Sequence, residues 1–242
     1  KGSLLGEAYL LFRALDEGMT AKEVRESILD GKIITPGTWE TRRTIWNHLN
    51  LRYLSDSPSW IVKTIMLASR EGPHNPRFIS LLYLHYTLRN RLVFDFVTEF
   101  VWPQWCSKSI SIERRDVLDF FEAKSEEESQ ITRWRESSLK KLASNTLSAL
   151  RDFTLLKGVQ KKVIQTPALP HETALHLAHV LHCEGKEGWE ILNAPDWRLF
   201  LLNVDEVSNV LTNLAQKKQI RFERAGSSIT LEFLKEGGVS DK

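Results

Sequence analysis

The segment "FISLLYLHYTLRNRLVFDFVTEFVW", Phe78 to Trp102, constrains the fold of this chain more than any other. It is long and apolar enough to be taken for a membrane span. It also contains His85, Arg89, Asn90, Arg91, Asp95 and Glu99. Because charges near the centre of a bilayer cost about 2.5–3.5 kcal/mol each on insertion scales, we predict a buried central helix and no membrane partner.

The composition agrees with a globular protein of a reducing compartment. Hydrophobic residues make up 42% of the chain, which suffices for a sizeable core. Cys106 and Cys183 alone cannot form a disulfide framework, and no signal peptide is visible in a sequence that starts at Lys1. We therefore expect a cytoplasmic protein, while the net charge of +2 leaves the class of partner open.

The apolar periodicity predicts a mainly α fold with helix-turn-helix-like and winged-helix-like elements and a small C-terminal β-hairpin. Residues 1–55 read as a domain of three helices, the second opened by a capping box from Thr20 to Glu23. In the third helix, Arg43 is a candidate DNA contact. Arg42 shares a side with Trp39, Trp46 and Leu49 and is expected at the edge of the core.

Two further domains are predicted, residues 56–167 and residues 168–242. The first is helical, with a basic helix and a basic strand, Gln160 to Gln165. The second has three helical segments, and then "IRFERAGSSITLEF" alternates in two arms around Ala-Gly-Ser-Ser. That alternation predicts the hairpin, and three helices with a hairpin fit a winged helix.

The stretch "ESSLKKLASNTLSALRDFTLL", Glu136 to Leu156, is the best candidate for a contact surface. On a helical wheel its core side comprises Leu139, Leu142, Ala143, Thr146, Ala149, Leu150 and Phe153. The other side presents the candidate DNA-binding residues Lys140, Lys141, Ser144, Ser148 and Arg151. Small hydroxyls permit close approach and cations suit phosphates, although a solvated basic face would give the same pattern.

The charge distribution favours a contact surface. Residues 113–136 carry eight acids and five bases, net −3, whereas residues 137–165 carry six bases and one acid, net +5. The second group includes Lys161 and Lys162 in the basic strand, which we add to the candidate DNA contacts. A recognition helix followed by a basic wing has this distribution.

Catalytic and metal sites are not expected. Glu172, His176, His179 and Cys183 share one helix face, but the first and last lie about 16 Å apart at 1.5 Å per residue and cannot bind one ion. No phosphate-binding loop, nucleophile elbow or zinc motif is present. We therefore predict no catalytic residue, no cofactor and no metal.

The order of several segments resembles that of a known family. It runs from "SLLGEAYLLFRAL" through "RRTIWNHLNLRYL", "RNRLVFDFVTEFV" and "DVLDFFEAK" to "ESSLKKLASNTLSALRDFTLL" and "IQTPALP". These segments, over roughly residues 4–170, resemble the BrxA family, accessory proteins of the BREX bacteriophage-exclusion systems. The resemblance implies a non-enzymatic, mostly helical protein that binds double-stranded DNA and works with other phage-defence proteins of its locus.

The predicted function is therefore sequence-tolerant binding of duplex DNA within a phage-defence assembly. Phosphate contacts are expected from the cations of the basic helix and strand. Two alternatives remain open at this stage: an adaptor that docks other defence proteins without touching DNA, and an RNA-binding protein that uses the same helix.

Overall fold

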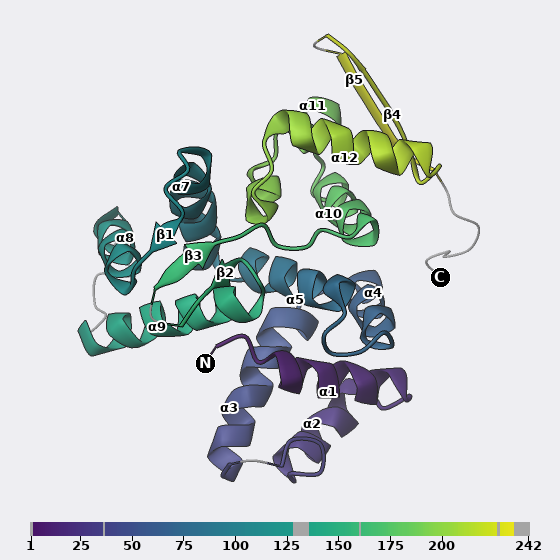
Figure 1. Ribbon diagram of the computed structural model, residues 1–242. Coiled ribbons are helices and arrows are strands. Elements are labelled where there is room, and N and C mark those ends of the chain that lie inside the picture. The colour runs from purple at the N-terminus through teal and green to yellow at the C-terminus, as the bar shows by residue number, and fades with distance from the viewer. Residues whose placement is uncertain (1, 36, 128–135, 160, 227, 235–242) are drawn as a thin grey trace. The chain divides into compact units, whose positions relative to one another are not determined.

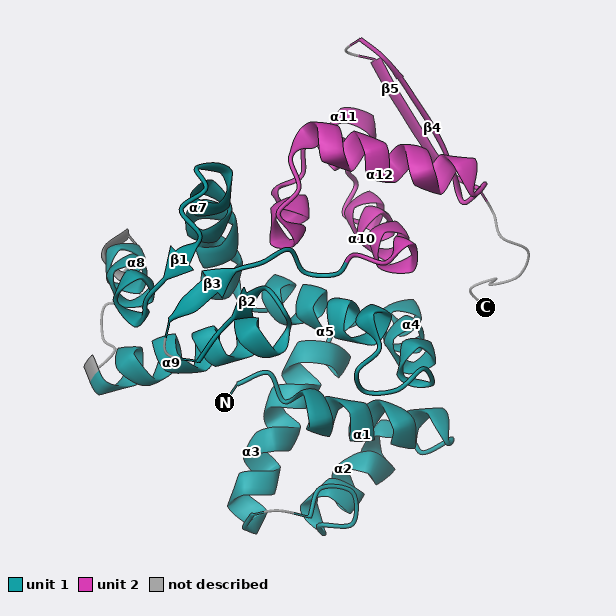
Figure 2. Ribbon diagram, viewed as in Figure 1, with its two compact units in different colours: residues 1–168 teal, residues 169–242 magenta. Residues whose placement is uncertain are grey.

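The computed structural model describes residues 2–35, 37–127, 136–159, 161–226 and 228–234 (Figure 1). The fold is mainly α with a small C-terminal hairpin, as predicted. The chain divides into two compact units, residues 1–168 and residues 169–242 (Figure 2). Gln160, the first residue of the expected basic strand, lies outside the described residues.

Unit 1 begins with α1 (Leu5–Asp16), α2 (Ala21–Leu29) and α3 (Trp39–Leu49), which continues as the π-helix η1 (Asn50–Leu54). The predicted capping box is present, since the Thr20 N–H donates to Glu23 at 2.7 Å and the Glu23 N–H donates to the Thr20 hydroxyl at 3.3 Å. The connection from α2 to α3 is longer than the 3–4-residue turn of a helix-turn-helix.

The expected domains 1–55 and 56–167 fall within the same unit. The reason is that α1 packs on α4 (Ser59–Ser69), and α4 in turn packs on α5 (Pro76–Leu88). Arg70, just after α4, also forms an ion pair with Asp16 at 2.7 Å. The first three helices therefore share a core with the elements that follow them.

The apolar segment Phe78–Trp102 is not one helix, which corrects the prediction. It is divided among α5, α6 (Arg91–Asp95), the π-helix η2 (Phe96–Val101) and the first residue of α7 (Trp102–Cys106). Asn90 causes the break: its backbone leaves the helical region, and its Oδ1 accepts a hydrogen bond from the Val93 N–H at 3.3 Å. No helix among the described residues has the length and apolarity needed to cross a membrane.

α5 nevertheless occupies the central, buried position predicted for this segment, because residues 80–87 are all buried. Burial lowers the pKa of His85 to about 3, and the nearby charge of Arg89 acts in the same direction. His85 is therefore neutral in the folded protein at any pH well above 3.

This neutral histidine makes stability depend on pH. Between about pH 6.5 and pH 3 the unfolded chain binds a proton at His85 that the folded chain does not bind. The free energy of unfolding should therefore decrease as the pH falls through this window, by up to about 1.4 kcal/mol per pH unit. Denaturant unfolding at pH 7 and pH 5 measures this slope, and His85→Gln should reduce it. An unchanged slope in the variant would assign the acid sensitivity to other groups.

The remainder of unit 1 contains β1 (Ser111–Ile112), α8 (Arg114–Glu127), α9 (Glu136–Asp152), β2 (Leu156–Lys157) and β3 (Lys162–Ile164). The strands form an antiparallel sheet in the order β1-β3-β2, with Ile112 opposite Lys162 and Lys157 opposite Val163. α8 and β2 both pack on α9 (Figure 1). This sheet therefore joins the two ends of the α8–α9 pair.

Unit 2 contains α10 (His171–Cys183), α11 (Gly188–Leu192), the 3₁₀-helix η3 (Pro195–Phe200) and α12 (Val204–Gln216). The predicted hairpin follows as β4 (Ile220–Ala225) and β5 (Ser228–Phe233). β4 packs on α12 and β5 on α11. Trp197 is almost fully buried in this unit, and its indole N–H donates to the Ile191 carbonyl at 2.8 Å.

Candidate nucleic-acid interface

α9 is anchored by its apolar side. Ala143, Thr146, Ala149, Leu150 and Phe153 are buried, as the helical periodicity predicts. The ring of Phe153 lies 5.7 Å from that of Tyr83 and 5.1 Å from that of Tyr86, both in α5. Leu142 differs from the prediction because it remains partly exposed.

The outer side of the first half of α9 is exposed and basic. Lys140 and Lys141 are both exposed, and the Ser144 hydroxyl donates to the Lys140 carbonyl at 3.0 Å. Arg114, the first residue of α8, donates from Nη2 to the same carbonyl at 3.0 Å. We call Arg114, Lys140 and Lys141 the basic cluster. Its charges come from two helices that meet near the start of α9.

The second half of the same side has the beginning of the chain beside it. Asp152 accepts a hydrogen bond from the Ser3 hydroxyl at 2.7 Å and pairs with Arg151 at 3.1 Å. A Cβ placed on Gly2 would lie 4.0 Å from that of Ser148. Arg151 is therefore ion-paired, with its side chain 40% exposed, and Ser148 is partly exposed beside Gly2, so their role as DNA contacts stays a prediction.

The turn between β2 and β3 separates the two lysines predicted there. Lys161 is exposed, whereas Lys162 is buried. The Lys162 ammonium donates to the carbonyls of Gly158 at 2.8 Å and Val159 at 2.9 Å, so it holds the turn from inside. Burial lowers the pKa of Lys162, and the charge of Arg151 lowers it further. The prediction of Lys162 as a phosphate contact is therefore wrong.

Gly158 is required for the same turn. Its φ is +94°, and a Cβ at this position would collide with the carbonyl oxygen of Lys161. Lys157 and Lys161 are both exposed on this turn, and Val159 is 79% exposed at its tip. Lys157 and Lys161 are therefore two accessible cations on either side of the turn.

The two neighbouring lysines permit a matched test. Lys162→Met should lower the free energy of unfolding by about 1–3 kcal/mol, because two hydrogen bonds from a charged group are lost. Lys161→Met should change stability by less than about 0.5 kcal/mol, as expected for an exposed site. Thermal unfolding of both variants is the measurement. Equal stability of the two would contradict a structural role for Lys162.

The α3 candidates have different roles. Arg42 donates to the Leu29 carbonyl at 2.9 Å and the Gly37 carbonyl at 2.7 Å, and thus holds the connection between α2 and α3. Arg43 is exposed, with its guanidinium 5.4 Å from the centre of the Trp39 ring. Trp39, expected on the core side, is 46% exposed. Arg43 therefore remains accessible, but on an element other than α8 and α9.

The histidine-rich helix α10 places its side chains in unlike environments. His176 is buried, while His179 and His182 contact the ring of Phe233 at 5.3 and 5.1 Å. Cys183 lies 3.8 Å from His179. Among the residues that the structure describes, no three histidine, cysteine or acidic side chains are grouped so that they could hold one metal ion.

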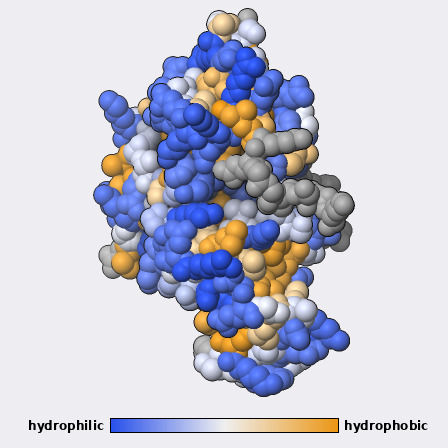
Figure 3. Space-filling view, turned by 90° about the vertical axis from the view of Figure 1, so that its right-hand side faces the viewer, coloured by the Kyte–Doolittle hydropathy of each residue, from blue (hydrophilic) through white to orange (hydrophobic). Residues whose placement is uncertain are grey.

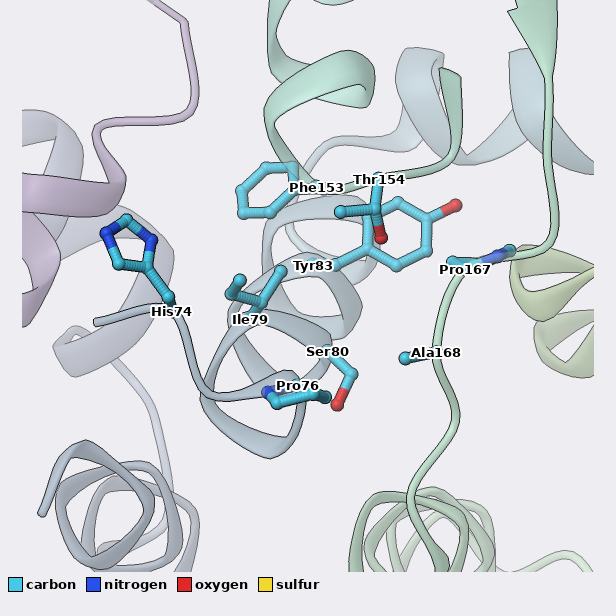
Figure 4. Close-up of a pocket in the computed structure, with 9 residues that line it drawn as sticks. All are labelled: His74, Pro76, Ile79, Ser80, Tyr83, Phe153, Thr154, Pro167 and Ala168. Atoms are coloured by element: carbon cyan, nitrogen blue, oxygen red, sulfur yellow. The ribbon is translucent and has the colours of Figure 1, made fainter. Parts of the chain in front are cut away.

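A pocket of about 130 Å³ lies between the start of α5 and the segments that follow α9 and β3. Figure 4 shows the His74 imidazole and the Tyr83 hydroxyl at opposite ends of the group of lining side chains. Burial raises the pKa of Tyr83 far above its usual range. The two groups are therefore not arranged as an acid–base pair.

The molecular surface is mostly hydrophilic on the face that Figure 3 shows. Hydrophobic side chains occur there in several separate patches and do not form a continuous band.

Comparison with known proteins identifies the family. A family model described as BrxA matches residues 1–180. The chain belongs to the BrxA family. The match includes all of unit 1 and most of α10, and thus both the basic cluster and the β2–β3 turn. No curated protein matches the sequence. Membership of the BrxA family makes this chain a component of a BREX phage-defence system and suggests other proteins of that system as partners.

Arg114 is the member of the site that sequence reasoning missed. It belongs to the net-acidic segment 113–136, so the charge count hides it. The only available clue was its position, at the start of the helix that precedes the basic one. Its proximity to Lys140 depends on how α8 and α9 cross, which local sequence does not specify.

Proposed function

We propose that this BrxA-family protein is a non-enzymatic, double-stranded-DNA-binding component of its defence system. The observation that carries the proposal is the meeting of Arg114 with the exposed Lys140 and Lys141 at the start of α9. Lys161 and Lys157, on the β2–β3 turn, supply further phosphate contacts. Ser144 lets the helix approach the DNA backbone closely.

The order of elements supports this assignment. β1, α8, α9, β2 and β3 follow one another with the strand order β1-β3-β2, which is the arrangement of winged-helix DNA-binding domains. In such domains the last helix enters the major groove and the turn between the last two strands forms the wing. α9 and the β2–β3 turn occupy these two positions. Unit 2, with helices followed by a hairpin, has a related order.

Duplex DNA suits this surface better than duplex RNA. The major groove of B-DNA is about 12 Å wide and admits an α-helix. The major groove of A-form RNA is deep and narrow, so a helix cannot enter it. Lysine and serine mostly contact the backbone, which favours binding that tolerates many sequences.

Binding assays across a salt series test the proposal against its alternatives. Five phosphate contacts, from Arg114, Lys140, Lys141, Lys157 and Lys161, should give a slope of about −4.5 in log affinity against log salt. Duplex DNA should bind more tightly than duplex RNA or single strands. An adaptor that docks only defence proteins would show no salt-dependent affinity for any nucleic acid, and preference for duplex RNA would favour the RNA-binding alternative.

A further inference from the structure

A second pocket, of about 250 Å³, lies on the flank of α9 in unit 1. Its walls come from the end of α3, the π-helix η1, the end of α5 and the middle of α9. The polar lining includes Arg52, Arg89, Asn90, Asn145 and Thr146, and no acidic residue lines it. The pocket therefore has an excess of positive charge and of hydrogen-bond donors.

Both arginines donate hydrogen bonds to backbone carbonyls. Arg52 donates to the carbonyls of Gly2 at 3.0 Å and Ser3 at 3.1 Å, and its guanidinium lies 4.7 Å from the centre of the Tyr86 ring. Arg89 donates to the carbonyl of Asp56 at 2.9 Å. These contacts orient the two guanidinium groups beside a pocket that no acidic residue lines, which suits an anionic ligand.

Thr146 provides an independent indication of a ligand. Its residue is 1% exposed, and its hydroxyl oxygen is buried without a hydrogen-bond partner. Five other threonines in helices donate to the carbonyl four residues earlier: Thr44, Thr64, Thr87, Thr98 and Thr212. Thr146 departs from this pattern, so its hydroxyl is left for a partner in the pocket that it lines.

The backbone beside the pocket is also unusual. Arg52 and Leu51 belong to η1, and π-helical turns are frequent at functional sites. Leu51 is 62% exposed, and with Leu142 it gives the lining an apolar part. The apolar part and the two carboxamides match a flat ring with polar edges, and the two cations match a phosphate on the same ligand.

We propose that this pocket binds a nucleotide. Arg52, Arg89 and the Thr146 hydroxyl hold the phosphate, while Leu51, Leu142 and the Asn145 carboxamide contact the base. The nucleotide is either free or the terminal nucleotide of a DNA strand. None of the three basic-cluster residues lines the pocket, so nucleotide binding and duplex binding can fail independently.

The test uses the full chain and calorimetric titration with dAMP, dTMP and inorganic phosphate. Both nucleotides should bind saturably, and more tightly than phosphate. Thr146→Val, which keeps the shape of the side chain, should weaken nucleotide binding about tenfold or more. The same change should raise the melting temperature of the unliganded protein, because it removes an unpaired buried hydroxyl. Arg89→Gln, at an exposed position, should also weaken binding.

Further arms separate the two sources of the nucleotide. They measure the affinity for three DNA forms: linear duplexes with 5′-phosphate ends, linear duplexes with 5′-hydroxyl ends, and a closed circle. Each affinity is measured for the parent protein and for Thr146→Val. Saturable dAMP binding that depends on Thr146 supports a free nucleotide, and a Thr146-dependent preference for phosphorylated ends supports a strand terminus. The proposal is overturned if neither is observed, or if Thr146→Val and Arg89→Gln leave all binding unchanged.

Discussion

Lys140→Glu combined with Lys141→Glu should remove most of the affinity for duplex DNA and leave the melting temperature nearly unchanged. Both side chains are exposed on α9, away from the buried residues that anchor it, so the fold should tolerate the change. Each lost phosphate contact should flatten the plot of log affinity against log salt by about one unit. The loss should be similar for unrelated DNA sequences, because phosphate contacts position the protein and carry no sequence information.

The matched control is Lys22→Glu with Lys63→Glu, which makes the same change of charge at two exposed helical positions on α2 and α4. If binding depended only on net charge, the two double variants would lose affinity equally. If the α9 variant bound DNA like the parent, α9 would not be the contact surface. Arg43→Glu would then test α3 as the contact surface. Arg221 and Arg224 of the C-terminal hairpin are weaker candidates, because they are already ion-paired with Glu223 and Asp205, respectively.

Phe153→Ala should have the largest effect on stability, a loss of about 3–5 kcal/mol. Phe153 is 1% exposed, and its ring connects the end of α9 to two tyrosines of α5. Truncation removes this contact and leaves a cavity that α9 cannot fill without moving. For a chain of this size the loss corresponds to a decrease of roughly 10 °C in melting temperature.

Phe153→Leu is the graded control, because it keeps most of the apolar volume and should cost about 1–1.5 kcal/mol. Denaturant unfolding at constant temperature compares the three proteins. A loss below about 1 kcal/mol for Phe153→Ala would show that α9 is not fixed to α5 by this ring. In that case the position of the basic cluster would depend mainly on α8 and the sheet.

Local features of the fold could be predicted because neighbouring residues determine them. The capping box at Thr20 and the hairpin around Ala225–Ser228 both depend on residues a few positions apart, and both are present. The buried stripe of α9 also followed from helical spacing alone. The break at Asn90 was missed because an apolar segment gives no warning that a side-chain cap will interrupt it.

The candidate site was only partly predictable because tertiary contacts decide which cations are accessible. Lys161 and Lys162 are adjacent in sequence, yet Lys161 is exposed just before β3, while the Lys162 ammonium is bonded to carbonyls of the turn and is buried. Arg151 looks like a free cation on a helical wheel, but it is paired with Asp152, which also accepts a hydrogen bond from Ser3. A wheel describes one helix and contains no information on what lies against it.

The hydrogen bond between Ser3 and Asp152 joins residues 149 positions apart, and this has a consequence for biosynthesis. A ribosome adds about 5–20 residues per second, so Ser3 is made roughly 7–30 seconds before its partner exists. During that interval α9 has not been synthesised, so Gly2 and Ser3 cannot contact it. The nascent α1–α3 segment therefore emerges before the elements that it packs against. Unit 1 therefore reaches its native contacts late in translation, after α9 has left the exit tunnel.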